Sequence, residues 1–401
     1  MSQSSSPITR TEMPTSPFAR LETLLDGLEP GDSVIDLTIG EPRHPMPDFL
    51  IPALAEAEAD FGKYPAIRGT KAFRAAVADW LGRRYPALTG LDKESLGIIP
   101  LAGTREGLFY VTFSVCARRP DIENPAILVP NPFYHTYAAA GASGAELVLL
   151  SADRHAGFLP DLDAIDEELL KRTVAMFVCT PTNPQGTVAS AAYIQRAIEL
   201  ARTHDFILVA DECYSEIYTT APPPGALETA WQQTGSLANV ISMQSLSKRS
   251  NLPGLRAGYC TGDPEFIEKF ASFRNVVGPQ LPVPIQHACV KILGDEAHVE
   301  ANRALYREKF DAADRILGNR YGYRRPDGGF FLWLDISDFG DSESVVKTLW
   351  KGCGVKLLPG TFLARTGADG KNPGDGYIRV AMVQDLAMTE DALSRMVDTL
   401  K

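Results

Sequence analysis

Strand-sized apolar runs alternate with helical patterns through the middle of this chain. Helical stretches such as 191–204 lie between several of the runs. Alternating β and α elements favour a mostly parallel, doubly wound sheet. The sequence therefore predicts an α/β fold. The predicted strands are 97–101, 126–130, 146–150, 174–180, 206–211 and 240–244.

Polar residues follow the ends of these predicted strands. In an open parallel sheet, ligands bind beyond the carboxyl ends of the strands, where such residues come together. The pattern therefore predicts one binding site at that edge of the sheet. The candidate segments are 103–104, 131–134, 181–183, 211–214 and 245–248.

Composition and charge exclude several classes of protein. The formal net charge is −11 and the pI is about 5.2, so a nucleic-acid surface is not expected. The apolar runs are far shorter than the ~20 residues that span a bilayer. Residues 1–16 lack the apolar core of a secretory signal, so we expect a mobile tail and a cytoplasmic protein.

The cysteines and histidines form no metal-binding pattern. The six cysteines include no CxxC pair, and buried free thiols in a reducing cytoplasm are expected instead. His44, His135 and His287 are interpreted as polar packing residues. No metal is therefore predicted.

One lysine lies among hydroxyl side chains, with an arginine eight residues further on. The segment 245–256 contains Ser245, Ser247, Lys248 and Arg256. A lysine amine can form a Schiff base with an aldehyde once it has lost its proton, and burial or nearby cations favour that loss. Two serines and an arginine supply the donors that a phosphate monoester needs. An aldehyde that carries a phosphate is pyridoxal 5′-phosphate, so the segment points to this cofactor.

This segment resembles the lysine motif of fold-type I pyridoxal-phosphate enzymes in the class I/II aminotransferase family. Further segments match in the family's order along almost the whole chain. The resemblance implies a large cofactor-binding domain (46–289) around the parallel sheet. It also implies a smaller α+β domain, in which residues 290–401 pack with the N-terminal segment 17–45. Homodimers with shared active sites, acting on small amino and keto acids, are expected.

Two further motifs surround the expected cofactor ring. Asp211 ends an apolar strand and begins a segment similar to the family's D-E-x-Y motif, which implies that it pairs with the pyridine nitrogen. The same motif implies that Tyr214 hydrogen-bonds to the ring's 3-oxygen. Asn183, in a segment similar to N-P-x-G, would contact the same oxygen and would also help to bind the substrate. Read without the family, Asp211 could cap a helix, and Asn183 lies in a turn.

A phosphate site is expected where residues 103–107 precede a helical stretch. Thr104 could simply cap that helix, but a helix N-terminus also binds anions through free N–H groups. The resemblance implies contacts from Gly103 and from the backbone at Thr104 and Arg105. Ser245, Ser247 and Arg256 would complete this phosphate cradle, and Tyr64 would reach the phosphate across a dimer interface.

The remaining motif residues concern the ring face and the substrate. Tyr134 aligns with the aromatic residue that stacks on the cofactor, and Phe133 is the alternative one position away. Arg379 alternates with apolar residues on a predicted strand, where an unpaired charge is costly. A buried ion pair or an edge position would explain it, whereas the resemblance implies a clamp on the substrate α-carboxylate. Gly40 would add a backbone contact to that carboxylate.

The strings 40–45, 245–256 and 372–379 are similar to N-succinyldiaminopimelate aminotransferases of lysine biosynthesis. The resemblance implies transfer from glutamate to N-succinyl-2-amino-6-oxopimelate by double displacement, with Lys248 moving the proton as base and acid. Arg43 and Arg105 are candidates for binding the distal carboxylate, and surface salt bridges would explain either residue equally well.

Other members of the family remain as alternatives: an aspartate, alanine or aromatic aminotransferase, or a C–S lyase. An aminotransferase-like transcription regulator is disfavoured, because residues 1–16 leave no room for a winged helix.

Overall fold

A seven-stranded sheet forms the centre of the computed structural model, which describes residues 15–91, 93–367 and 370–401. The strand order is β2-β8-β7-β6-β5-β3-β4. β8 runs antiparallel to both neighbours, and the other pairs are parallel. The predicted α/β class is therefore confirmed. The strands are β2 (Ile98–Leu101), β3 (Ala126–Asn131), β4 (Glu146–Ser151), β5 (Thr173–Cys179), β6 (Ile207–Asp211), β7 (Val240–Ser245) and β8 (Gly258–Gly262).

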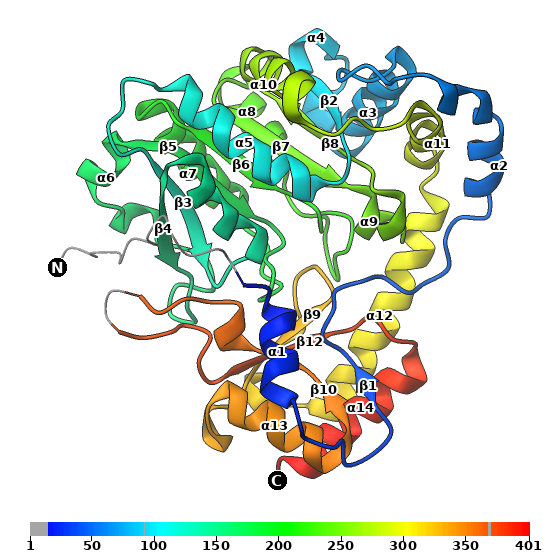
Figure 1. The fold of residues 1–401 in the computed structure, drawn as a ribbon, viewed down its shortest axis with the longest axis vertical. Helices are drawn as coiled ribbons and strands as arrows, with labels where there is room; N and C mark the ends of the chain where they lie inside the picture. Colours follow the sequence, from blue (N-terminus) through cyan, green and yellow to red (C-terminus); the bar gives the residue numbers. More distant parts are fainter. Residues whose placement is uncertain (1–14, 92, 368–369) are drawn as a thin grey trace.

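Helices cover both faces of this sheet (Figure 1). Side chains alternate between the two faces along each strand. In β3, Ile127 and Val129 pack with α5 (Thr104–Arg118) and α10 (Pro264–Val277). Leu128 belongs to the core of the opposite face. That face is covered by α3 (Lys71–Arg84), α7 (Ala191–Thr203), α8 (Ala226–Thr234) and α11 (Val283–Gly294).

A second layer of structure, meaning here a separate group of helices and short strands, is formed by the N-terminal and C-terminal segments of the described chain (Figure 1). Its antiparallel sheet has the order β11-β12-β9, and β1 pairs with β10 in parallel. The predicted domain limits stay a prediction, and residues 1–14 of the predicted tail lie outside the described residues. The elements are α1 (Pro17–Leu25), β1 (Ile35–Asp36), α12 (Ala297–Leu317), β9 (Phe331–Asp335), α13 (Ser342–Cys353), β10 (Val355–Lys356), β11 (Leu358–Pro359), β12 (Tyr377–Ala381) and α14 (Leu386–Thr399).

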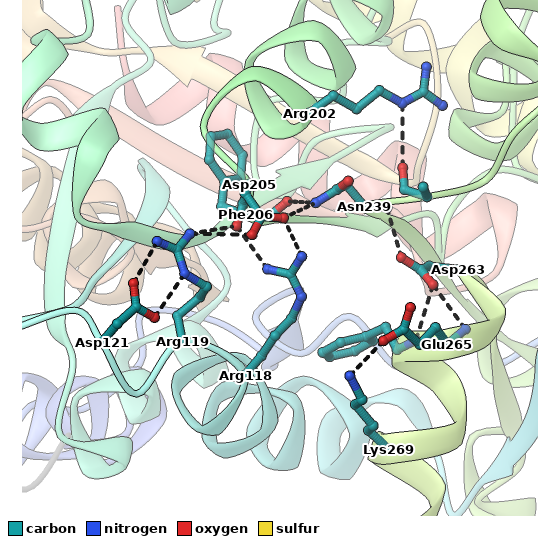
Figure 2. A network of polar contacts seen from close by, with 12 residues as sticks. Arg118, Arg119, Asp121, Arg202, Asp205, Phe206, Asn239, Asp263, Glu265 and Lys269 are labelled. Atoms are coloured by element: carbon teal, nitrogen blue, oxygen red, sulfur yellow. Dashed lines mark hydrogen bonds and ion pairs between the residues drawn. The ribbon is translucent and has the colours of Figure 1, made fainter.

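Polar contacts anchor the strands at the edge opposite to the predicted site (Figure 2). Arg118 and Arg119, at the end of α5, donate to the Asp205 carbonyl oxygen at 2.8 and 3.1 Å. Asn239 donates to the Asp205 carboxylate at 3.1 Å and to the Phe206 carbonyl oxygen at 3.0 Å. These contacts join the starts of β6 and β7 to α5. The carboxyl ends of the same strands lie at the other edge of the sheet.

Candidate active site

A cavity of about 960 Å³ lies at the carboxyl ends of the parallel strands and is also lined by residues of the second layer. Gly103 packs against the guanidinium of Arg256, which lines the cavity, whereas Tyr64 is fully exposed and lies outside the cavity. The structure brings the other predicted site residues together. These are Gly40, Thr104, Arg105, Tyr134, Asn183, Asp211, Tyr214, Ser245, Ser247, Lys248, Arg256 and Arg379.

Lys248 lies on the short helix α9 (Leu246–Arg249), directly after β7. Ser245 caps this helix by accepting a hydrogen bond from the Ser247 N–H at 3.2 Å. The Lys248 Nζ donates to the carbonyl oxygen of Gly40. Burial, together with nearby cations, lowers the pKa of Lys248 to about 8. The amine therefore becomes neutral, and hence nucleophilic, at a lower pH than an exposed lysine.

Asp211 ends β6 and is 4% exposed. Its carboxylate accepts hydrogen bonds from the Tyr137 hydroxyl at 2.6 Å and from the Cys213 N–H at 3.3 Å. Burial raises the pKa of Asp211, so a cation in the cavity would stabilise its ionised form. The helix-cap interpretation is wrong, because a turn follows Asp211 and the next helix begins only at Ala226. Tyr137 had no sequence signal that would link it to Asp211.

Arg379 lies on β12 with 4% exposure, between β11 and β9, so the edge interpretation is wrong. Its partners are neutral rather than acidic. Nη1 donates to Asn183 Oδ1 at 2.9 Å, and Nη2 donates to the Thr38 carbonyl oxygen at 2.7 Å. In the described part of the chain, the buried Nε has no hydrogen-bond partner. A buried donor of this kind calls for an acceptor from a ligand or water.

The segment Leu358–Pro359 forms an edge strand, β11, beside Arg379. Leu358 pairs with Arg379, and Pro359 pairs with Ile378. A proline is tolerated in an edge strand because one side of the strand needs no ladder hydrogen bonds. This pairing makes β12 the central strand of its sheet.

The start of α5 and Arg256 form one concave surface. The helix begins at Thr104, and Gly103 is its cap residue, so the interpretation of Thr104 as the cap is off by one residue. Gly103 has φ of 82°, and a Cβ atom there would lie 2.2 Å from Arg256 Nη2. Only glycine therefore lets the guanidinium approach the helix N-terminus. Together with the hydroxyls of Ser245 and Ser247, these groups can bind an anion.

Tyr134 lines the cavity, whereas Phe133 is buried in the core with 2% exposure. The structure therefore favours Tyr134 over Phe133 as the aromatic residue that faces a ligand. Arg105 Nε donates to the Tyr134 hydroxyl at 3.1 Å. His135, which the sequence suggested as a packing residue, also lines the cavity. Burial and nearby cations lower the pKa of His135 to about 4, so the ring is neutral.

All six cysteines are free, as expected, but only four of them are buried, because Cys116 and Cys213 are partly exposed. Within residues 15–91, 93–367 and 370–401, no cluster of histidine, cysteine and acidic side chains could hold a metal ion. No helix in the same ranges is long and apolar enough to cross a membrane.

A mostly parallel α/β sheet with a partly buried lysine, a buried aspartate and an anion-binding helix end at one edge defines a fold-type I enzyme. The sequence model of the family Aminotransferase class I and II matches residues 32–397. The chain belongs to this family, and it is an aminotransferase.

Known proteins resemble the chain over nearly its whole length. The LL-diaminopimelate aminotransferase of Desulforudis audaxviator strain MP104C is 32% identical over 96% of this chain and 95% of that protein. An aminotransferase structure from Neisseria meningitidis Z2491 is 38% identical, with a TM-score of 0.91 and coverage of 98% and 100%. A probable N-succinyldiaminopimelate aminotransferase from Thermus thermophilus is 26% identical, with a TM-score of 0.83 and coverage of 96% and 100%.

Proposed function

We propose that the chain binds pyridoxal 5′-phosphate on Lys248 and transfers amino groups between glutamate and a keto acid. The observation that carries this proposal is the meeting of three groups in one cavity: the Lys248 amine, the Asp211 carboxylate and the concave surface between α5 and Arg256. The family as a whole depends on this cofactor. Reduction with borohydride, as described in the Discussion, tests the proposal.

The chemistry of the cavity fits the cofactor. Asp211 is buried and would be stabilised by the protonated pyridine nitrogen. Ser245, Ser247, Arg256 and the N–H groups at Thr104 and Arg105 would hold the phosphate, with Gly103 leaving room for Arg256. Tyr134 would stack on the ring. Asn183 and Tyr214 would contact its 3-oxygen, and burial raises the pKa of Tyr214, so its hydroxyl stays a donor.

When bound, the cofactor supplies an electron-withdrawing ring that stabilises negative charge on the substrate α-carbon. Residues of the chain itself would move the proton and bind the substrate. Lys248 Nζ takes up the α-proton, and its lowered pKa suits that task near neutral pH. Arg379 binds the α-carboxylate, with Asn183 holding its Nη1 in place. Gly40 also lines the cavity, and its backbone would contact the same carboxylate.

We expect Arg379→Lys to weaken both half-reactions by roughly tenfold or more, because lysine keeps the charge but loses the planar fork. Single-turnover rates with glutamate and with the keto acid measure the two halves separately. Arg324→Lys is the matched control, since Arg324 donates to Thr187 and lies over Phe158. If only the half-reaction with the keto acid weakens, Arg379 binds the distal end of that substrate instead.

A homodimer is part of the proposal. Tyr64 is 100% exposed, and large apolar side chains at Ile51, Phe61, Val276 and Val277 are also exposed. Exposed apolar surface of this kind is typical of protein–protein contacts. In such a dimer, Tyr64 of one chain would reach the phosphate in the other chain's cavity.

We further propose an acidic, extended substrate from diaminopimelate biosynthesis, N-succinyl-2-amino-6-oxopimelate. The strings 40–45 and 372–379 support it, as does the likeness to the Thermus thermophilus protein. Arg105 is exposed and lines the cavity, where it is available to a distal carboxylate, whereas Arg43 does not line it. LL-Diaminopimelate is the second candidate. Several relatives carry that name, and the Glu41 carboxylate, which also lines the cavity, could bind its distal ammonium group.

With glutamate as donor, kcat/KM should be higher for N-succinyl-2-amino-6-oxopimelate than for oxaloacetate, pyruvate or phenylpyruvate. It should also fall as ionic strength rises, because an attraction between Arg105 and a carboxylate is screened by salt. Arg105→Leu should lower kcat/KM for this substrate and weaken its dependence on ionic strength. Arg43→Leu is the control and should change neither. Preference for one of the three simple acids by roughly tenfold, or about 1.4 kcal/mol, excludes this substrate. Faster turnover of unsuccinylated LL-diaminopimelate than of its N-succinyl form with 2-oxoglutarate selects the second candidate.

A further inference from the structure

A series of hydrogen-bonded polar side chains, of which Asn302 and Lys309 are buried and His44 is partly buried, connects α12 to the helix that carries Lys248. Asn302, on α12, is 3% exposed. Its Nδ2 donates to the carbonyl oxygens of Lys248 and Arg249, each at 3.3 Å. The last carbonyls of any helix lack partners within that helix, and α9 has only one turn. Asn302 therefore caps the C-terminal end of α9.

The capping bonds determine the direction of the next contact. Carbonyl oxygens only accept hydrogen bonds, so the Asn302 nitrogen must face α9 and its oxygen must face the other way. That oxygen lies 2.6 Å from His44 Nδ1, which must therefore carry the ring proton. His44 Nε2 is then an acceptor, and Lys309 Nζ donates to it at 2.6 Å. The hydrogen bonds thus run in one direction, from Lys309 through His44 and Asn302 to the carbonyl oxygens of α9.

Burial keeps the His44 ring in a single protonation state near neutral pH, whereas it lowers the pKa of Lys309 to about 8. Burial and the charge of Lys309 lower the pKa of His44 to about 4, so the ring stays neutral. Lys309 is 2% exposed, and it also donates to the Met382 carbonyl oxygen at 3.1 Å. The His44 ring packs on Tyr306, with 4.4 Å between centroids. A neutral histidine between a lysine and an amide is therefore fixed in place by both polar and aromatic contacts.

The segment that contains His44 also touches the lysine amine. Gly40, four residues before His44, accepts a hydrogen bond from Lys248 Nζ. The segment 40–44 is thus linked to both the amine and, through Asn302, the main chain of Lys248. His44, Asn302 and Lys309 are not among the described residues that line the cavity.

We propose that His44, Asn302 and Lys309 are positioning residues that hold α9 and so direct the Lys248 amine into the cavity. The importance of that amine rests on the proposed function. The positioning itself does not, because it concerns the cofactor-free chain. Losing the cap would let the single turn of α9 fray, and the amine would become more accessible to water.

The test measures Lys248 directly in the cofactor-free, full-length protein. The rate of acylation of Lys248 is followed by peptide mass spectrometry over a range of pH, and the affinity for pyridoxal phosphate is measured by equilibrium dialysis. The wild-type midpoint is expected at a pH of about 8. Asn302→Ala should raise it by about half a pH unit or more, toward that of an exposed lysine. The same change should weaken cofactor binding about tenfold, equal to about 1.4 kcal/mol.

Two further variants make the result decisive. His44→Phe keeps an aromatic ring against Tyr306 but removes both hydrogen bonds, and it should shift the same two measurements even if Asn302→Ala does not fold. Gln286→Ala removes a fully buried amide whose hydrogen bonds go to Thr70 and Leu281, outside α9. Gln286→Ala should lower the Tm without changing the acylation midpoint of Lys248 or the affinity for the cofactor.

Two outcomes count against the proposals, and they are separable. The positioning role is wrong if His44→Phe, and Asn302→Ala where it folds, leave the acylation midpoint and the cofactor affinity at their wild-type values, as Gln286→Ala should. If the wild-type protein binds no pyridoxal phosphate, the proposed function fails, while the acylation midpoints still decide whether the three residues position Lys248.

Discussion

Lys248→Ala is expected to lower turnover by about 10⁴-fold, the upper range for loss of a general base and acid. The substitution removes the amine that we propose takes up the α-proton, and no other lysine lines the cavity among the described residues. Stopped-flow measurement of the glutamate half-reaction gives the size of the loss. Lys291→Ala, which removes an exposed lysine paired with Glu56, is the control.

The same variant tests how the cofactor is held. Wild-type protein should be yellow, and borohydride should fix the cofactor to the peptide that contains Lys248. Lys248→Ala should carry no fixed cofactor after the same treatment. Label on another lysine, or a wild-type protein that stays colourless after the cofactor is added, would exclude the proposed role of Lys248.

Asp211→Asn is expected to lower turnover by at least ~100-fold, or about 2.7 kcal/mol. Asparagine has nearly the same shape but removes the charge that would favour a protonated pyridine ring. The Tyr137 hydroxyl at 2.6 Å should stay in contact, so the side chain keeps its place. Asp263→Asn changes an aspartate that caps α10, and it should alter the Tm more than turnover. Near-normal turnover of Asp211→Asn would mean that the ring nitrogen has another partner.

The central sheet could be predicted because its strands are buried on both faces. Runs such as 126–130 and 206–211 are therefore continuously apolar and end at polar residues. The strand predictions agree with β2 to β7 to within one or two residues. The positions of Asp211 and Lys248 followed from the same feature, since each comes at or just after the end of its strand.

Other parts of the site depend on contacts between distant segments. Tyr137 reaches Asp211 across 74 residues, and Asn302 reaches Lys248 across 54. Their residue types carried no signal, because a tyrosine near a helix and an asparagine on a helix are common. The helix cap at Gly103 was missed because its φ of 82° is visible only in the folded backbone. The role of Tyr64 depends on a second chain, so neither the sequence nor one protomer decides it.

The pairing of β1 with β10 bears on the order in which the protein can be completed during its synthesis. Ile35 pairs with Val355, so this contact cannot form until residue 355 has left the ribosome. All strands of the seven-stranded sheet lie within residues 98–262 and leave the ribosome earlier. Arg379 is made later still. Lys248 and Asp211 thus emerge well before Arg379 of the same cavity, and the nascent chain cannot assemble this cavity until Arg379 has left the ribosome.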